Sequence, residues 1–147
     1  MYKVAIITAS DKGYAGERED KSGSTIEEIV TAHELEVTGK VILPDDRQML
    51  SDQMLNYCHQ GIDLILTTGG TGFSKRDVTP EATADIVERR ADNLTFAMIA
   101  NSLQYTPKAM LSRGIAGIRE NTLIVNLPGS PKAVRENLEY AIDAIIH

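Results

Sequence analysis

The sequence predicts an α/β fold: a single-domain, three-layer sandwich in which helices cover both faces of a mostly parallel sheet. Three observations predict it. Four short runs rich in Val and Ile are apolar throughout, as is typical of strands buried on both faces. Segments with helical spacing alternate with these runs, which favours parallel strands joined by helices. The length of 147 residues suits one domain rather than two, so we expect residues 1–147 to fold as one unit.

The four predicted strands are short and spread along the chain. They cover Val4–Thr8, Val37–Leu43, Asp63–Thr68 and Thr122–Leu127. Their β-branched residues fit a pleated, buried surface. With the helices described next, the expected order of elements is β-α-β-α-β-α-α-β-α.

The first two predicted helices carry signals at their ends. The first runs from Ser24 to His33, where Ser24 and Glu27 have the spacing of a capping box. The second runs from Arg47 to Gln60, and Gly61 follows in the position that commonly ends a helix. Both segments repeat apolar residues at helical spacing.

Three more helices are predicted further along the chain. One runs from Thr79 to Arg90 and has Pro80 at its first helical position. Another follows from about Leu94 to Gln104. The last runs from Pro131 to the end of the sequence and has the clearest apolar face.

Charge and composition limit the partners of the chain. Fifteen Lys and Arg residues against 21 Asp and Glu residues give a formal net charge of −6, without a long basic run. Nucleic acids and anionic membranes bind basic patches, so we expect neither as a partner. No stretch approaches the roughly 18 apolar residues of a membrane helix. The single cysteine, Cys58, excludes an internal disulfide, and we expect it to be a core residue of a cytoplasmic protein.

Residues capable of chemistry follow each predicted strand. In an open parallel sheet, ligands bind outside the carboxyl ends of the strands, where the loops converge. Here those loops contain Gly, Pro, hydroxyl and acidic residues. They are residues 9–16, continuing through a charged stretch to Ser22 and Gly23, and then residues 44–47, 69–77 and 128–132.

The turn at Thr67–Gly72 reads Thr-Thr-Gly-Gly-Thr-Gly. Successive glycine amides can form a nest for an anion, and the absent side chains leave room for a phosphate. The spacing matches neither the Walker A loop nor the dinucleotide fingerprint. A phosphate loop and a plain tight turn are both compatible with these residues.

The loop at Pro128–Pro131 strengthens the case for an anion. Ser130 can cap the last helix, and Pro131 suits its first position, so free amides and the helix dipole favour negative charge there. A simple capped helix start is the alternative. Three basic residues near these turns are candidates for neutralising phosphate, although each also suits a solvated surface: Lys75, Arg76 and Lys132.

Carboxylates accompany these loops. Asp77 lies between the glycine-rich turn and the helix expected from Thr79. Asp45 and Asp46 follow another predicted strand, which we expect to lie beside the strand that precedes Asp77. Acidic residues at a phosphate site commonly hold Mg²⁺, which bridges phosphate oxygens. The alternative makes Asp77 a helix-entry residue and the other two turn formers.

No protein nucleophile is evident. His33, His59 and His147 have neither metal-ligand spacing nor a partner arrangement typical of a catalytic triad. Transfer between phosphates fits, because an attacking phosphate is already anionic at neutral pH and catalysis reduces to positioning and charge stabilisation.

Together the loops resemble the molybdopterin adenylyltransferases of molybdenum cofactor biosynthesis, a MogA/MoaB-like family related to the G domains of gephyrin and Cnx proteins. Residues Thr67–Thr83 read TTGGTGFSKRDVTPEAT and carry the most specific part of this resemblance. Leu111–Arg113 and Asn126–Pro131 also match. Thr8–Asp11 and Asp20–Gly23 extend the resemblance over nearly the whole chain.

The resemblance implies the molybdopterin-binding fold and a Mg²⁺-dependent transfer of AMP from ATP to the terminal phosphate of molybdopterin, which releases pyrophosphate. It implies Asp77 with Asp45 or Asp46 as catalytic carboxylates, and Asp77 and Asp45 as the favoured metal ligands. It also implies a homotrimer, and the molybdenum-inserting enzyme of the same pathway as a partner. The residues expected to bind substrate and nucleotide are Ser10, Asp11, Ser22, Gly69, Gly70, Thr71, Gly72, Ser112, Gly129, Ser130, Pro131 and Lys132.

Two other interpretations fit the same loops. Relatives of this family bind molybdopterin without established catalysis, so a non-catalytic binding protein is one alternative. A scaffold in which the loops are only turns is the other. The phosphate loops do not themselves reveal a pterin, and that part of the expectation rests on the resemblance.

Overall fold

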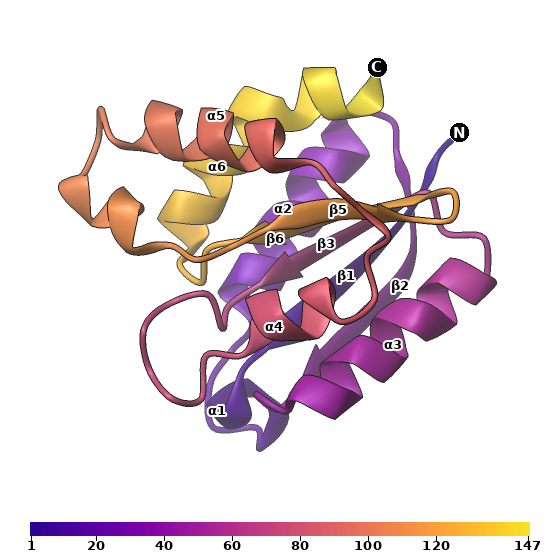
Figure 1. Cartoon of the computed structure of the whole chain (residues 1–147), viewed down its shortest axis with the longest axis horizontal. Helices are drawn as coiled ribbons and strands as arrows, with labels where there is room; N and C mark the ends of the chain where they lie inside the picture. The colour runs from indigo at the N-terminus through magenta and orange to yellow at the C-terminus, as the bar shows by residue number, and fades with distance from the viewer.

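A computed structural model describes all 147 residues and confirms the α/β class with a single mostly parallel sheet (Figure 1). Six strands are hydrogen-bonded in the order β2-β1-β3-β6-β5-β4. Strands β2, β1, β3 and β6 are parallel, whereas β5 is antiparallel to both β6 and β4. The strands are β1 (Lys3–Ala9), β2 (Glu36–Leu43), β3 (Leu64–Thr68), β4 (Arg89–Arg90), β5 (Ala116–Arg119) and β6 (Thr122–Leu127).

Helices cover both faces of this sheet, as the apolar strands required. Figure 1 shows α2, α5 and α6 over one face and α3 with α4 over the other. No helix is both long and apolar enough to cross a membrane. The helices are α1 (Asp11–Tyr14), α2 (Lys21–Ala32), α3 (Arg47–His59), α4 (Thr79–Ala84), α5 (Asp92–Ser102) and α6 (Pro131–Ile146), with a 3₁₀ helix, η1 (Pro107–Leu111).

Each face of the sheet has its own hydrophobic core. Successive residues of a strand point to opposite faces. Ile6 of β1 therefore packs in the core that α2, α5 and α6 cover, and Ile7 packs in the core that α3 and α4 cover. Cys58 is buried in the second core, as expected. This double burial explains why the parallel strands are apolar throughout.

The antiparallel edge of the sheet was not predicted. Strands β4 and β5 have two and four residues, too few for an alternating pattern to be recognised. The helix expected over Thr79–Arg90 ends at Ala84, because Arg89 and Arg90 pair with β5 instead. Exposed arginines on an edge strand discourage pairing with another chain.

Several helix ends also differ from the prediction. Helix α2 begins at Lys21 rather than Ser24, because the Asp20 side chain accepts a hydrogen bond from the Gly23 amide and caps the helix. The capping box at Ser24 was therefore wrong, and that hydroxyl donates to the Asp20 carbonyl. Helix α5 begins at Asp92, two residues earlier than expected. Helices α1 and η1 were not predicted, since each spans little more than one turn.

The start of α6 follows the prediction. Ser130 is the N-cap, and its hydroxyl accepts a hydrogen bond from the Ala133 amide at 3.2 Å. Pro131 occupies the first turn, where its missing N–H costs nothing. The amino end of α6 therefore lies directly beyond the carboxyl end of β6.

Candidate active site

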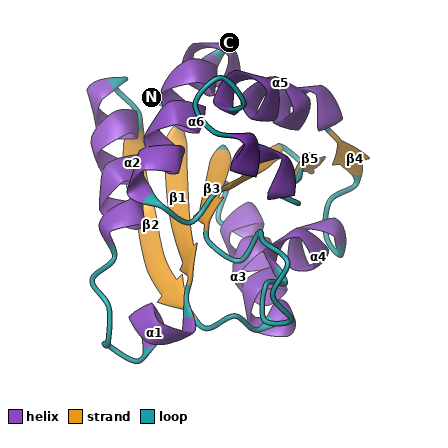
Figure 2. Cartoon of the chain, turned by 90° about the vertical axis from the view of Figure 1, so that its left-hand side faces the viewer, coloured by secondary structure: helices purple, strands orange, loops and turns teal.

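Two neighbouring cavities lie at the carboxyl ends of the parallel strands. The first, of about 490 Å³, lies among the loop after β3, η1, α5 and α6, and we call it the α5–α6 cavity. The second, of about 740 Å³, lies among the segment from β1 to α2, Asp45 and the loops after β3 and β6, and we call it the α1 cavity. Figure 2 shows β1 and β2 running toward α1 at this end of the sheet. Both volumes are typical of small-molecule sites.

Four residues line both cavities and so mark the place where they meet: Gly70, Asp77, Gly129 and Ser130. Of the other residues predicted to bind ligands, Ser10, Ser22, Gly69 and Pro131 line the α1 cavity. Thr71, Gly72 and Ser112 line the α5–α6 cavity. The loops after β1, β3 and β6 thus converge, because their parallel strands end at one edge of the sheet.

The glycine-rich loop can take its path only because two of its residues lack side chains. Gly69 and Gly70 have φ angles of +89° and +69°, which disfavour other residues. A Cβ atom on Gly69 would lie 2.4 Å from the Ala9 carbonyl oxygen, and one on Gly70 would lie 2.3 Å from Thr79 Oγ1. The loop therefore passes directly over the end of β1 and against the start of α4.

Asp45 and Asp77 line the α1 cavity together. Oδ2 of Asp45 accepts a hydrogen bond from the Asp11 amide at 3.2 Å, whereas Oδ1 is buried and has no partner. The hydroxyl of Thr79 is likewise buried without a partner. Both unpartnered oxygens lie next to Gly70, since a Cβ there would be 3.2 Å from Asp45 Oδ1 and 2.3 Å from Thr79 Oγ1. Burial raises the pKa of Asp45 above its ordinary value.

Asp46 has a different position from its neighbour. Its side chain caps α3 by accepting a hydrogen bond from the Met49 amide at 2.9 Å, and it lines neither cavity.

We expected the strand before Asp45 and Asp46 to lie beside the strand before Asp77. This was wrong, because β1 lies between β2 and β3. The loop carrying Asp45 nevertheless reaches the same cavity as Asp77.

Asp11 also lies outside both cavities, although its backbone contacts one of their carboxylates. Its side chain accepts hydrogen bonds from Arg76 Nε at 3.0 Å and Nη2 at 2.8 Å, and another from the Asp45 amide at 2.9 Å. The Arg76 guanidinium holds the pKa of Asp11 below its ordinary value. Asp11 and Asp45 thus bind each other's amides, which joins the loops after β1 and β2.

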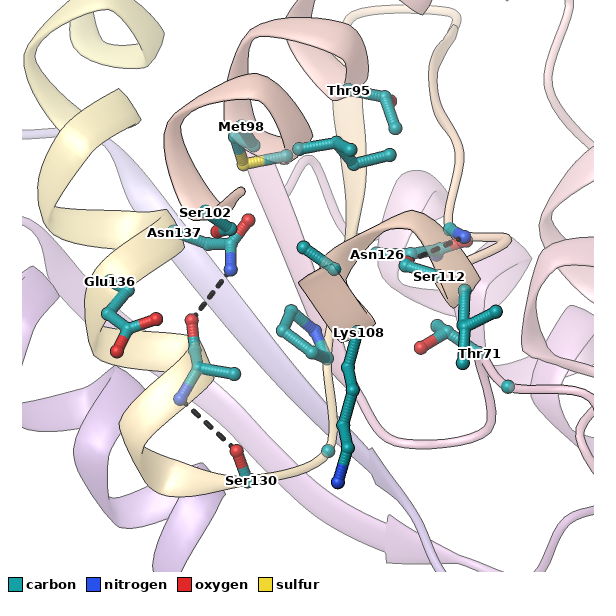
Figure 3. Close-up of a pocket in the computed structure, with 18 of the residues that line it drawn as sticks. Thr71, Thr95, Met98, Ser102, Lys108, Ser112, Asn126, Ser130, Glu136 and Asn137 are labelled. Atoms are coloured by element: carbon teal, nitrogen blue, oxygen red, sulfur yellow. Dashed lines mark hydrogen bonds between the residues drawn. The ribbon is translucent and has the colours of Figure 1, made fainter. Parts of the chain in front are cut away.

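The basic residues in the cavities are not the ones expected. Lys132 lies in a separate surface depression, Lys75 is exposed outside both cavities, and Arg76 is paired with Asp11. Instead, Lys108 extends along the α5–α6 cavity, where it is the only basic side chain (Figure 3). The basic side chains that line the α1 cavity are Arg18 and Lys21. No local pattern distinguished these three residues from other surface cations.

Sequence reasoning also missed one wall of the α5–α6 cavity. Figure 3 shows Thr95, Met98 and Ser102 on one helix and Asn137 on another. The hydroxyls of Thr95 and Ser102 are buried without hydrogen-bond partners. Thr95, Met98 and Ser102 recur at i, i+3 and i+7, which places them on one face of α5. The signal was present in the sequence, but the same spacing also describes a helix packed in a core.

Arg113 also belongs to the site, although sequence analysis assigned no role to this residue. Its Nε donates to the Gly72 carbonyl at 2.7 Å, and its Nη2 donates to the Asp77 carbonyl at 2.7 Å. Its Nη1 lies 2.6 Å from Oε2 of Glu81 in α4. The Arg113 backbone amide also donates to the Thr71 carbonyl at 2.8 Å. The segment after η1 is therefore fastened to the glycine-rich loop.

No group of three or more His, Cys, Asp or Glu side chains is placed to hold a metal ion by itself. Asp45 and Asp77 would supply two carboxylates to a cation between them. Mg²⁺ usually takes one or two carboxylates and completes its shell with water and substrate phosphates. The unpartnered Asp45 oxygen fits such a role, because a cation would satisfy it.

Comparisons with known proteins all point to one family. A family model described as "Probable molybdopterin binding domain" matches residues 5–147. Gephyrin of Dictyostelium discoideum is 42% identical, and the match covers 98% of this chain but only 21% of gephyrin. The molybdopterin adenylyltransferase of Helicobacter pylori strain J99 is 39% identical, with 97% of this chain and 82% of that protein covered. Among solved structures, the molybdopterin biosynthesis enzyme MoaB of Thermus thermophilus is 44% identical with a TM-score of 0.93, covering 98% of this chain and 91% of that one.

Proposed function

This chain belongs to the molybdopterin binding domain family, and we propose that it is a molybdopterin adenylyltransferase of molybdenum cofactor biosynthesis. In the proposed reaction, a terminal phosphate oxygen of molybdopterin attacks the α-phosphorus of ATP. The bond from that phosphorus to the pyrophosphate oxygen breaks, and adenylylated molybdopterin and pyrophosphate are formed. The name of the Helicobacter pylori relative, which this chain matches over most of its length, supports this activity.

The observation that carries the proposal is the pair of cavities that meet at shared residues. Each has the volume of a small-molecule site, at about 490 and 740 Å³. One substrate in each cavity would bring the two reacting phosphates together beside Gly70, Asp77 and Ser130. Two adjoining cavities at the same strand ends would accommodate both substrates of a transfer reaction.

The junction and the walls of the two cavities suit phosphate chemistry. The amino end of α6 carries the positive end of a helix dipole, which favours an anion. Lys108 in one cavity, and Arg18 with Lys21 in the other, can neutralise phosphate charge. Because the attacking phosphate is already anionic, positioning and charge stabilisation suffice, and no protein nucleophile is needed.

We also propose Mg²⁺ as the cofactor. Asp45 and Asp77 would hold it, and the Thr79 hydroxyl lies close to the unpartnered Asp45 oxygen. When bound, the ion would neutralise charge on the phosphate oxygens. Without a cation, Oδ1 of the half-buried Asp45 would remain unsatisfied.

The proposal extends to assembly and location. Phe96, Tyr105 and Met110 expose large apolar side chains on and around α5 and η1, which supports burial against further copies in a homotrimer. The molybdenum-inserting enzyme of the same pathway would receive the product. The single free cysteine, Cys58, supports a reducing compartment such as the cytoplasm.

The test is AMP transfer by the purified protein. Molybdopterin, ATP and Mg²⁺ should yield adenylylated molybdopterin and pyrophosphate in equal amounts. We expect Asp77→Asn to abolish turnover and to change the Tm by no more than about 2 °C, because a loop carboxylate makes few core contacts. In the variant, the amide oxygen can still accept the hydrogen bond that Asp77 takes from the Ser74 amide.

Other results would favour the alternatives. Molybdopterin binding that ATP does not affect, without AMP transfer, would show a non-catalytic binding protein. A scaffold whose loops are only turns predicts that Asp77→Asn leaves ligand binding unchanged in calorimetry. A Tm lowered by many degrees in that variant would make Asp77 a structural residue.

A further inference from the structure

The backbone of the loop between the two cavities is held from outside by one side chain, while Arg76 within the loop pairs with Asp11. Residues 72–77 form no helix or strand, and Phe73 is 71% exposed. Within the loop, the Asp77 amide donates to the Ser74 carbonyl, and the Ser74 amide donates to Asp77 Oδ2. The only hydrogen bonds to the backbone of this segment from outside it come from the Arg113 guanidinium. These bonds reach Gly72 and Asp77, the first and last residues of the loop.

The geometry of this contact suits a fixed support. A guanidinium is planar and presents its donors in a rigid fork, so it can hold three acceptors at set angles. Here the acceptors are two carbonyl oxygens at 2.7 Å and Glu81 at 2.6 Å. Glu81 belongs to α4, which packs on α3 and contributes Ala82 to the hydrophobic core. Arg113 therefore fastens the two ends of the loop to α4 through its ion pair with Glu81.

Arg113 itself does not contact the space available to ligands. It lines neither the α5–α6 cavity nor the α1 cavity, whereas its neighbour Ser112 lines the first. The side chains of Arg113 and Glu81 are 34% and 38% exposed, so the ion pair is only partly screened by water. Any effect of Arg113 on a reaction in the cavities must therefore pass through the loop that it holds.

We propose that Arg113, anchored by Glu81, is the positioning residue of the active site and fixes the Asp77 carboxylate where the two cavities meet. This role rests on the proposed adenylyltransferase function. Catalysis by positioning is sensitive to small displacements, because an error of about 1 Å can cost roughly 100-fold in rate. The contacts of Arg113 with Gly72, Asp77 and Glu81, which we call the Arg113 clamp, keep the glycine-rich loop and the loop after η1 in one arrangement while substrates enter and leave.

The test compares Arg113→Lys with Arg47→Lys. Lysine keeps the charge, but its ammonium group cannot hold two carbonyls and a carboxylate in one plane. We expect Arg113→Lys to lower kcat by about 10- to 100-fold while the KM values for ATP and molybdopterin change little. Arg47 is the matched control, since it forms a bidentate ion pair with Asp85 at the end of α4 and lines neither cavity. Its lysine variant should keep the wild-type kcat.

Hydrogen–deuterium exchange of the peptide containing residues 72–77 gives a second readout that does not depend on activity. We expect exchange about 10-fold faster in Arg113→Lys than in the wild type, and unchanged in Arg47→Lys. Glu81→Gln, which removes the anchor but keeps the guanidinium, should shift kcat and exchange in the same direction by less. This milder variant tests the clamp even if Arg113→Lys fails to fold.

Three results would overturn the proposal. They are wild-type kcat in Arg113→Lys, an equal fall in Arg47→Lys, and a fall in kcat without faster exchange in the loop. Failure of the proposed function looks different, because the wild type itself would then transfer no AMP. The exchange comparison would still decide whether Arg113 holds the loop.

Discussion

Asp45 and Asp46 are adjacent in the sequence, yet the fold gives them different surroundings. Asp46 caps α3 and faces the Met49 amide, whereas Asp45 lines the α1 cavity with one oxygen unpartnered. Both residues follow the same strand and both suit a turn, so the sequence could not separate them. The deciding contacts come from Asp11 and from the loop after β3, which are distant along the chain.

The environment of Asp45 predicts that its ionised carboxylate lowers the stability of the folded protein, although the proposed AMP transfer requires it. Burial raises its pKa above the ordinary value of 3.8, so the folded protein holds the Asp45 proton more tightly than the unfolded chain does. Stability therefore falls as the pH rises from 3.8 through the raised pKa, and the ionised carboxylate is destabilising at neutral pH. We expect Asp45→Asn to melt at or above the wild-type Tm at about pH 7, with a difference that shrinks toward about pH 4, and to lose AMP transfer.

Thermal melts across this pH range, together with the transfer assay, check the expectation. Asp46→Asn is the matched control, because asparagine caps helices as well as aspartate does, and it should change neither property. Asp46→Ala should lower stability by about 1 kcal/mol without abolishing transfer. A clear loss of stability in Asp45→Asn at neutral pH would contradict the assigned desolvation.

Among the elements, the loop after β3 shows how local and distant constraints combine. Its Gly69 and Gly70 were recognisable as residues of a tight loop, and their left-handed φ angles agree. The two glycines allow the loop to approach neighbouring segments closely, since Gly69 lies against the Ala9 carbonyl and Gly70 lies against Thr79. The same loop then depends on Arg113 for its position.

Replacement of Gly70 by alanine separates these two effects. Gly16 also has a positive φ, at +78°, but a Cβ there would meet nothing within 4 Å. Gly16→Ala should therefore cost only the conformational term, about 1–2 kcal/mol in the free energy of unfolding. Gly70→Ala adds a collision with the Thr79 hydroxyl and should cost at least about 1 kcal/mol more, with loss of AMP transfer. Denaturant titrations measure both, and equal costs would mean that the close approach is relieved without strain.

The sheet is stabilised by a hydrophobic core on each of its faces. Leu66 and Ile65 are neighbours in β3, both fully buried, and they belong to the two separate cores. Removal of either side chain should leave a cavity that the packed layers cannot close. The three-layer arrangement therefore predicts that the cores on the two faces of the sheet contribute similarly to the free energy of unfolding.

We expect Leu66→Ala and Ile65→Ala each to lower the free energy of unfolding by about 2–5 kcal/mol in denaturant titrations. Leu103→Ala is the control, because 43% of the Leu103 surface is exposed, and it should cost clearly less. A small loss for either core variant would indicate that one helical layer packs loosely on the sheet.

The α/β class, the four parallel strands and the loops that carry the candidate residues could all be predicted from the sequence. These features depend on hydrophobic periodicity and on Gly, Pro and capping residues, all of which act within a few positions of the chain. The sequence also located the amino end of α6 at Pro131, because Ser130 is a local cap. Where the competing signals were also local, as at Ser24 and Asp20, the prediction chose the wrong residue.

Which side chains meet could be seen only in the folded molecule. It separated Asp45 from Asp46, placed Lys108 rather than Lys132 in the α5–α6 cavity, and bound Arg113 to Asp77. It also turned the end of an expected helix into strand β4, because Arg89 and Arg90 pair with β5. Each of these outcomes depends on contacts between segments far apart in the chain, and such contacts leave no periodic or local mark in the sequence. Burial and hydrogen bonding are satisfied in three dimensions, whereas sequence patterns record only the preferences of neighbouring residues.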